Sequence, residues 1–550
     1  MKQQTVLRGS VWLIVSALAA KALGAIFRIP LTAMLGGTGM GYFSCAYGLF
    51  LPVFALSVTG INTAVSAVTA QALAEHDEAA AARTARLALR MFGAGGAICA
   101  AGLFLLAEPL CCGLLHNPRA ALAVRLFAPA VLFCCLNAVL RGICEGRQNM
   151  QPTAVSQVAE GIGRAAAGLL LCNAVLREPS AVLRFLPQET TSTEAAAAAA
   201  ILGVTLSTAA GFLTLLCFTG IHRPQQHLHD RQHDRILRQS LLKILLPVAA
   251  ASLVTNLTSL IDLATGLRLM AVVIRRNPAA YGLPQQLLPE DAAAQANFCF
   301  GAFSGLAMTV FNLVPAVTNM LGKGVFPAFA AAFSQHRRAE TVLHAQQVML
   351  RTAFLAVPAG LGISALAEPI LQMLFPARQA EIAAAAPPLR LLGIAVIFAA
   401  MSFPLFSMLQ AAGFAGDTVP VMLRGAAVKL ICNLLLIPVY GLRGAACSTG
   451  LCYALIFLLA LRKFRLRTGI TPHLLQIYSG SLAGGLLCAW TAARTYPRLT
   501  AVLPQRTALL CAVAAGGAVY LLTHLLMHCM QKKQSTILDR TLGKGLMKHL

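Results

Sequence analysis

The sequence Leu106-Ala-Glu-Pro-Leu110 recurs almost unchanged as Leu366-Ala-Glu-Pro-Ile370, 260 residues further along the chain. Each copy follows one apolar stretch of helical length and precedes another. Further pairs of similar residues keep a similar spacing: Arg90 with Arg351, Asn62 with Asn319, and Pro152 with Pro420. These pairs predict an internal duplication, and the duplication organises the whole chain.

Apolar stretches of about twenty residues, enough to cross a bilayer as helices, surround both copies of the motif. Six precede the polar break at 222–239, near 11–29, 42–63, 87–110, 122–143, 154–176 and 195–218. Six follow it, near 241–264, 298–321, 352–374, 389–409, 419–439 and 444–461, and two more lie near 474–493 and 507–527. The longest connection between spans is expected at 267–295.

The predicted fold is an all-α polytopic membrane protein with about fourteen transmembrane helices, arranged as two parallel six-helix lobes plus two C-terminal helices. An even number of helices in each copy gives both copies the same orientation, with the substrate site between them. The predicted domains are an N-terminal lobe at 1–220, a basic cytoplasmic linker at 221–240, a C-terminal lobe at 241–465, and the last two helices with a basic tail at 466–550.

The composition excludes several classes of protein. Of 550 residues, 58% are hydrophobic and 11% are charged, against about 25% charged residues in a soluble domain. The net charge of +24 would suit nucleic acid binding. However, most Lys and Arg flank apolar spans and are more frequent on the side that holds the N-terminus, which predicts cytoplasmic N- and C-termini and no nucleic acid partner. We find no Walker loop, Gly-x-Ser-x-Gly or His-Glu-x-x-His sequence and no zinc-type cysteine spacing, so a transporter without a resident metal is expected.

Ionisable residues inside the first span are the strongest functional candidates, because a buried charge is costly without a role. Lys21 and Arg28 are seven residues apart, so both project from one face of a helix. Gly24 lies between them and is predicted to act as a hinge that swings the two cations. The alternative for Arg28 is that it only anchors the helix by extending to the outer interface.

Two later spans place cations at related positions of the repeat, Arg164 in the fifth and Lys429 in the eleventh. Together with the first span they predict a central cavity that attracts an anionic phosphate or pyrophosphate headgroup. We include Asn62 and its counterpart Asn319 among the predicted substrate-binding residues. The alternative for Arg164 is a structural ion pair with Glu160, one helical turn earlier.

The seventh span contains Asp262, with Asn256 earlier in the same helix. Carboxylate and amide oxygens suit a coupling Na⁺, and a carboxylate can also carry H⁺, so these two residues are the predicted coupling-ion site. An ion pair between Asp262 and a neighbouring basic residue is the alternative. No organic cofactor is expected.

The first 75 residues carry the sequences Lys21-Ala-Leu-Gly24, Arg28-Ile-Pro-Leu31, Gly39-Met-Gly41-Tyr42 and Gly60-Ile-Asn62-x-Ala64-Val-Ser66. This pattern resembles the stage V sporulation protein B family, a branch of the multidrug, oligosaccharidyl-lipid and polysaccharide (MOP) exporter superfamily beside the lipid II flippases. Two departures are Asn62, where sporulation relatives commonly have Pro, and a second span without the basic residue of the lipid II branch.

The resemblance implies a flippase of the bacterial cell membrane that moves a polyprenyl-diphosphate-linked oligosaccharide by alternating access. The implied cargo is a peptidoglycan precursor such as lipid II, with a use in the spore cortex, and the implied partners are the bilayer, the anionic lipid-linked saccharide and cell-wall synthesis proteins. Two other functions stay open: a cation-coupled multidrug exporter of the same superfamily, and a membrane assembly scaffold that transports nothing.

Overall fold

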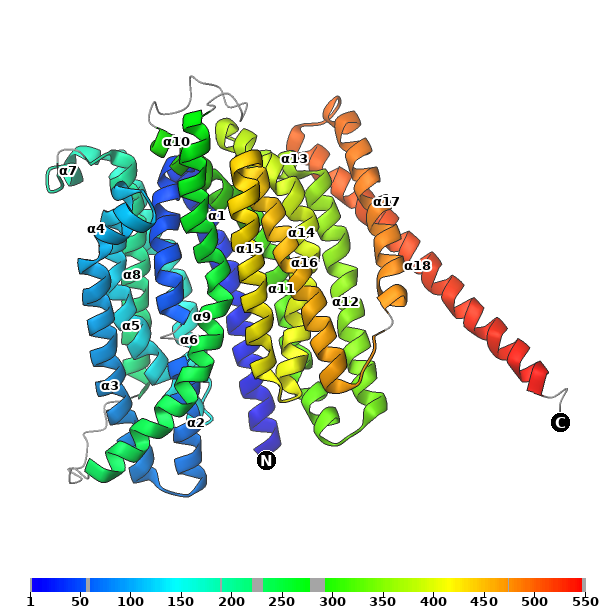
Figure 1. The fold of residues 1–550 in the computed structure, drawn as a ribbon, viewed down its shortest axis with the longest axis horizontal. Helices are drawn as coiled ribbons and strands as arrows, with labels where there is room; N and C mark the ends of the chain where they lie inside the picture. Colours follow the sequence, from blue (N-terminus) through cyan, green and yellow to red (C-terminus); the bar gives the residue numbers. More distant parts are fainter. Residues whose placement is uncertain are drawn as a thin grey trace. The chain divides into compact units, whose positions relative to one another are not determined.

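A computed structural model describes residues 2–55, 60–187, 190–219, 231–276, 292–472 and 474–546 of the chain, and within these ranges it contains helices and no strand (Figure 1). Eleven helices in these ranges are long and apolar enough to cross a membrane. The two halves of the first helix and the penultimate helix supply the remaining predicted spans. The prediction of an all-α polytopic membrane protein with about fourteen helices is therefore confirmed.

The spans of the first series lie in the following helices: α1 (Lys2–Phe54), α2 (Gly60–Ala74), α3 (Glu78–Leu105), α5 (Ala121–Gly146), α6 (Gln151–Arg177) and α8 (Ser192–Thr219). The second series comprises α9 (Arg231–Arg276), α10 (Ala292–Ala302) with the π-helix η6 (Phe303–Ala307) and α11 (Met308–Ser334), α12 (Arg338–Ala365), α14 (Gln379–Ala411), α15 (Thr418–Tyr440) and α16 (Leu442–Thr468). The last two are α17 (Leu474–Thr500) and α18 (Gln505–Leu546).

Helix α9 differs from its predicted boundaries at both ends. It begins at Arg231 rather than near residue 241, so the second half of the polar break is helical. It also continues to Arg276, through the first part of the connection expected at 267–295. Polar residues at helix ends do not interrupt a helix that has already left the hydrocarbon core, which is why hydropathy placed the start of α9 too late and its end too early. Residues 220–230 and 277–291 lie outside the described ranges.

The first two spans are joined inside α1 at Gly36, whose φ of 64° and ψ of −168° are not helical. Arg378 donates hydrogen bonds from Nε and a terminal nitrogen to the Ala33 carbonyl oxygen, at 3.0 and 2.8 Å. Glu381 accepts a hydrogen bond from the Gly37 amide at 3.1 Å. A cation therefore stands at the carboxyl end of one half-helix and an anion at the amino end of the next, as the helix dipoles favour.

The duplicated motif has the same local structure in both copies. Helix α3 ends before Leu106 and the short helix α4 (Ala107–Pro109) follows, while α12 ends before Leu366 and α13 (Ala367–Leu374) follows. The motif glutamate pairs with an arginine of the next span in each case: Glu108 with Arg125 at 2.8 Å, and Glu368 with Arg390 at 3.5 Å. The sequence repeat is thus also a repeat of local structure.

By packing, the chain divides into two compact units that do not coincide with the predicted lobes. The first contains Met1–Thr309, Ala377–Ala385 and Thr418–Ser448, and the second contains Val310–Pro376, Ala386–Asp417 and Thr449–Leu550. Helices α9, α10 and α15, which belong to the second sequence copy, therefore lie in the first unit. The lobe boundaries at 220 and 241 rest on the repeat alone and stay a prediction.

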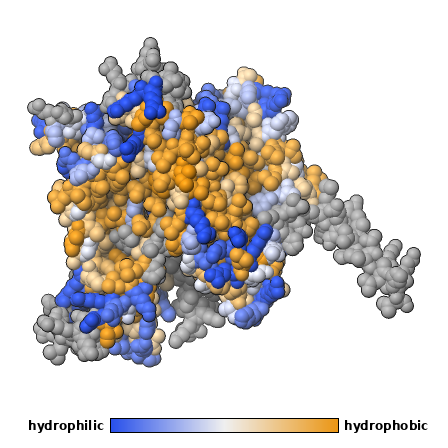
Figure 2. All heavy atoms as spheres, in the orientation of Figure 1, coloured by the Kyte–Doolittle hydropathy of each residue, from blue (hydrophilic) through white to orange (hydrophobic). Residues whose placement is uncertain are grey.

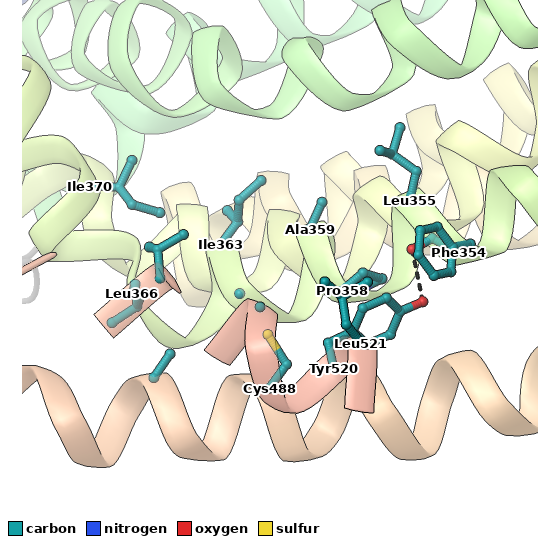
Figure 3. A pocket seen from close by; sticks show the side chains of 14 residues that line it. Phe354, Leu355, Pro358, Ala359, Ile363, Leu366, Ile370, Cys488, Tyr520 and Leu521 are labelled. Atoms are coloured by element: carbon teal, nitrogen blue, oxygen red, sulfur yellow. Dashed lines mark hydrogen bonds between the residues drawn. The ribbon is translucent and has the colours of Figure 1, made fainter. Parts of the chain in front are cut away.

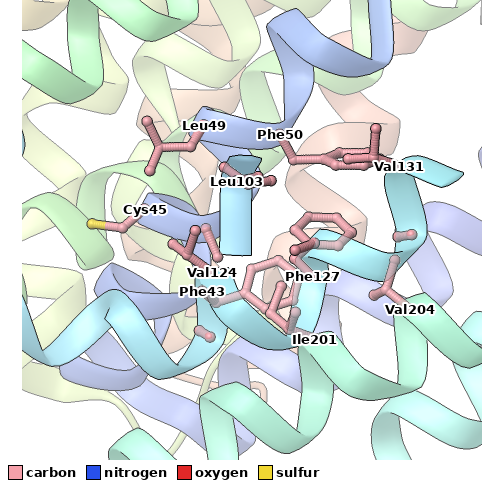
Figure 4. Packing of buried hydrophobic residues seen from close by; sticks show 14 of the residues in the cluster. Phe43, Cys45, Leu49, Phe50, Leu103, Val124, Phe127, Val131, Ile201 and Val204 are labelled. Carbon is pink, nitrogen blue, oxygen red and sulfur yellow. The ribbon is translucent and has the colours of Figure 1, made fainter. Parts of the chain in front are cut away.

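Buried apolar side chains from α1, α3, α5 and α8 form the core of the first unit (Figure 4). Phe50 of α1 stacks on Phe127 of α5 with ring centroids 4.0 Å apart. Other large apolar side chains, such as Leu213, Leu435 and Leu486, are exposed. On the face shown in Figure 2, hydrophobic residues cover the middle of the helices and hydrophilic residues gather towards their ends. Exposed leucines at mid-helix are expected of a protein whose solvent is lipid.

Candidate functional site

Two arginines and one glutamate form a cluster inside the first compact unit. Glu160 of α6 pairs with Arg141 of α5 through one carboxylate oxygen and with Arg164 of α6 through the other, both at 3.0 Å. The structure therefore contains the Arg164–Glu160 pair that was the predicted alternative to a free cation. It also adds Arg141, which shares the same carboxylate.

Sequence reasoning did not single out Arg141, although a signal was present. The residue lies two positions inside the predicted end of the fourth span, where an arginine is usually an anchor at the interface. In the structure it is 8% exposed, and its Nε donates to the Ser156 hydroxyl oxygen at 3.1 Å. An arginine this well buried and bonded belongs to the protein interior.

The Arg28 side chain extends from α1 to η6. A terminal nitrogen of its guanidinium group donates to the Ser304 carbonyl oxygen at 2.8 Å. The half-buried side chain is thus bonded within the protein, and its role as an anchor or as a substrate contact stays a prediction. Arg28 Nε is buried without a hydrogen-bond partner, and so is Arg164 Nε. Both guanidinium groups lie within electrostatic range of the Tyr47 hydroxyl group of α1.

Small residues on α6 bring the two cationic helices together. A side chain at Gly161 would collide with Leu23 of α1, and one at Gly168 would collide with Phe27. These close approaches place α1 directly against α6, on either side of Arg164 along the helix. The first and fifth spans therefore meet, as the predicted cationic site requires.

The remaining predicted residues of the first span are only partly described. Lys21 lies within α1, but its side chain is outside the described residues. The backbone is helical through Gly24, and an added Cβ there would meet nothing within 4 Å. The non-helical backbone of α1 is at Gly36 instead. The hinge at Gly24 stays a prediction.

The two repeated asparagines have different surroundings. Asn62 donates from Nδ2 to Glu145 Oε1 at 3.3 Å, while its Oδ1 is buried without a partner. Glu145 also accepts a hydrogen bond from the Thr153 hydroxyl at 3.1 Å. Asn319 lies half-buried in α11, within the second compact unit. A substrate role for either residue stays a prediction.

Lys429 does not contribute a free cation, because it pairs with Asp262. Its Nζ lies 2.6 Å from Asp262 Oδ2, and both residues are buried. Asn433, one turn after Lys429, donates to the other carboxylate oxygen of Asp262 at 3.1 Å. The structure therefore contains the ion pair that was the predicted alternative to a coupling-ion site. Asn256 lies half-buried earlier in α9 and also has an interaction partner.

An apolar groove lies in the second compact unit, between α12, α17 and α18 (Figure 3). Its volume is about 470 Å³, and its lining includes Leu366 and Ile370 of the duplicated motif. Tyr520 borders it and donates to the Phe354 carbonyl oxygen at 2.8 Å. No charged side chain lines the groove. It is therefore unsuited to the anionic headgroup that the arginine cluster fits.

Comparisons with known proteins agree with this fold. The family described as polysaccharide biosynthesis protein matches residues 6–333, which is more than half of the chain. The chain belongs to the polysaccharide biosynthesis protein family. It is 24% identical over 545 residues to stage V sporulation protein B of Bacillus subtilis (strain 168), covering 97% of this chain and 98% of that protein. It is 27% identical over 166 residues to the lipid II flippase MurJ of the same organism, covering 29% of this chain and 30% of that protein.

Solved structures of transporters share the fold of this family member. A lipid II flippase MurJ in an inward closed conformation matches with a TM-score of 0.69 at 13% identity, covering 98% of this chain and 99% of that chain. An inward-facing multidrug resistance MATE family transporter of the MOP superfamily matches with a TM-score of 0.62 at 13% identity, covering 83% of this chain and 98% of that chain. The chain is thus a multi-pass membrane protein with the fold of these transporters, as its hydropathy predicted.

Proposed function

We propose that this protein is a flippase that moves a polyprenyl-diphosphate-linked oligosaccharide across the bacterial cytoplasmic membrane by alternating access. The observation that carries the proposal is the excess of buried guanidinium groups over carboxylates. Arg141 and Arg164 share a single directly paired carboxylate, Glu160, and Arg28 bonds to a backbone carbonyl oxygen instead of a carboxylate. The next carboxylate along α5, Glu145, bonds to neutral groups, and counting it still leaves a net positive charge.

The unpartnered donors favour a phosphate-type ligand. A buried N–H group without an acceptor costs free energy, and both Arg28 and Arg164 have one at Nε. Diphosphate oxygens accept from several guanidinium donors at once, so a lipid diphosphate would satisfy both groups. Lys21, Asn62 and Asn319 are proposed to contact the same cargo, and Gly24 is proposed to let the first span bend.

The finer parts of the proposal rest on the relatives. Similarity to the lipid II flippase MurJ supports a peptidoglycan precursor as cargo, and similarity to stage V sporulation protein B supports a use in sporulation, for which we propose the spore cortex. Cytoplasmic N- and C-termini follow from the distribution of Lys and Arg along the sequence. Coupling to Na⁺ or H⁺, and contact with cell-wall synthesis proteins, stay predictions that no contact in the structure tests.

The test is a flipping assay with fluorescent lipid II in proteoliposomes. The wild-type protein is expected to expose lipid II in the opposite leaflet, and an Arg28→Gln, Arg164→Gln variant is expected to lose most of this activity. Arg125→Gln is the control, because Arg125 is an arginine of the neighbouring helix α5 whose side chain pairs with the exposed Glu108. Transport of cationic drugs without transport of lipid II would instead favour the multidrug exporter, whose fold is shared. Transport of neither lipid II nor drugs would favour the membrane assembly scaffold.

A further inference from the structure

The Lys429 ammonium group occupies the position that a bound cation would need beside Asp262. Its Nζ lies 2.6 Å from Asp262 Oδ2, and Lys429 is 2% exposed. Three helices of the first compact unit meet at this point: α9 contributes the carboxylate, α15 contributes the lysine and α16 begins alongside. The carboxylate is thus neutralised by a charge that belongs to the chain.

The groups around this pair are oxygen donors of the kind that bind hard cations. Asn433 Nδ2 donates to Asp262 Oδ1 at 3.1 Å and to the Thr265 hydroxyl oxygen at 2.8 Å. Asn433 Oδ1 in turn accepts a hydrogen bond from the Ser448 hydroxyl of α16. Asn433 and Ser448 are both 0% exposed. The nitrogen of the Asn433 amide faces Asp262 and its oxygen faces Ser448, so carboxylate, amide and hydroxyl oxygens lie in one buried hydrogen-bonded network, and such oxygens are the ligands of metal ions of the Na⁺ type.

We propose that this cluster is a latent site for a monovalent metal cation, and that Lys429 fills it permanently. One buried carboxylate is balanced by one positive charge, and a second cation beside Lys429 would leave a net charge in an apolar environment. The wild-type protein therefore does not bind Na⁺ at Asp262. Removal of the Lys429 side chain leaves the carboxylate unbalanced and frees the position of the ammonium group, so Na⁺ binds there.

The experiment measures Na⁺ binding directly and needs no assay of transport. Wild type, Lys429→Ala and Asp262→Asn/Lys429→Ala are purified in detergent. Their thermal unfolding midpoints are then compared in NaCl and in choline chloride of equal ionic strength, with binding of radioactive sodium as a second measurement. We expect no specific shift for wild type, a saturable rise of several degrees in Na⁺ for Lys429→Ala, and no rise for the double variant. The double variant is the matched control because it lacks the carboxylate as well.

Two results would overturn the proposal. One is saturable sodium binding to the wild type that is lost in Asp262→Asn. The other is a folded Lys429→Ala protein that is insensitive to Na⁺. Lys429→Asn, whose amide adds an oxygen, is the second variant in case the alanine variant is poorly folded. Recovery of either variant only in Na⁺ supports the proposal, whereas failure to recover both in Na⁺ contradicts it. None of these outcomes bears on the arginine cluster or on the proposed cargo.

Discussion

The two buried ion clusters of the first compact unit use related positions of the sequence repeat in different ways. Arg164 of α6 and Lys429 of α15 lie in the fifth span of each six-helix copy. Arg164 shares Glu160 with Arg141, so that cluster carries more positive than negative charge. Lys429 pairs with Asp262, one positive charge with one negative charge, and that pair is neutral. Two related helices therefore contribute to different clusters. We call the cluster of Arg141, Arg164 and Glu160 the open cluster, because its excess positive charge can attract an anion, and the Lys429–Asp262 pair the closed cluster, because its charges cancel.

The hydrogen bonds of the two clusters show the same difference. Arg164 Nε and Asn137 Oδ1, both in helices of the first cluster, are buried without partners. Around Asp262, by contrast, Asn433 donates to the carboxylate and accepts from Ser448. Unsatisfied polar groups favour a ligand that completes them, whereas a satisfied network stabilises the protein itself.

The largest effect on transport is expected from removing the positive charges of Arg28 and Arg164. Replacement of both Arg28 and Arg164 by glutamine should slow lipid II flipping by tenfold or more, corresponding to about 1.4 kcal/mol or more of lost interaction with the cargo. The measurement is the initial rate of leaflet exchange in proteoliposomes, with Arg125→Gln as the control. A rate equal to wild type would show that the positive charge is not used to hold cargo.

Breaking the closed cluster should affect stability more than transport. Asp262→Asn leaves the Lys429 ammonium group buried without a counter-charge, which typically costs about 3–5 kcal/mol. The double variant Asp262→Asn/Lys429→Gln removes both charges and should recover most of this loss. Thermal unfolding of the four proteins completes a double-mutant cycle. Equal destabilisation of the single and double variants would contradict a closed, self-compensating pair.

A smaller loss of stability is expected when one of the two arginines paired with Glu160 is replaced. Arg141→Gln leaves Glu160 paired with Arg164, so the cost is that of lost hydrogen bonds to Glu160 and Ser156, about 1–3 kcal/mol. The same unfolding measurement compares this variant with Asp262→Asn. A cost as large as that of Asp262→Asn would mean that the second arginine is needed for charge balance.

The smallest effect is expected at the ion pairs of the duplicated motif. The side chains of Arg125 and Glu108 are 42% and 65% exposed, and those of Arg390 and Glu368 are 59% and 48% exposed. Exposed pairs contribute about 0–1 kcal/mol, so Arg125→Gln and Arg390→Gln should both unfold within a few degrees of wild type. A loss as large as that of Arg141→Gln at either place would remove the distinction between surface and interior pairs.

Much of the fold could be predicted from the sequence, because a membrane-spanning helix is recognised from the hydropathy of consecutive residues alone. A span must be apolar over about twenty residues, so hydropathy located the eleven helices of the described ranges that are long and apolar enough to cross a membrane. Its errors were at polar helix ends, as at Arg231 and Arg276 of α9. The duplicated motif identified the repeat, and the cost of buried charge singled out Arg28, Arg164 and Lys429 as residues of the interior.

The tertiary structure decided which of these charges are paired. Asp262 and Lys429 are far apart in the sequence and meet because α9 packs against α15, while Arg141 reaches Glu160 from the neighbouring helix α5. Hydropathy and helical spacing describe one helix at a time, and the partner of a buried charge depends on which faces of different helices touch. The sequence alone therefore determined a membrane protein with cations in its spans, and the packing of the helices determined that one cluster keeps its positive charge and the other cancels it.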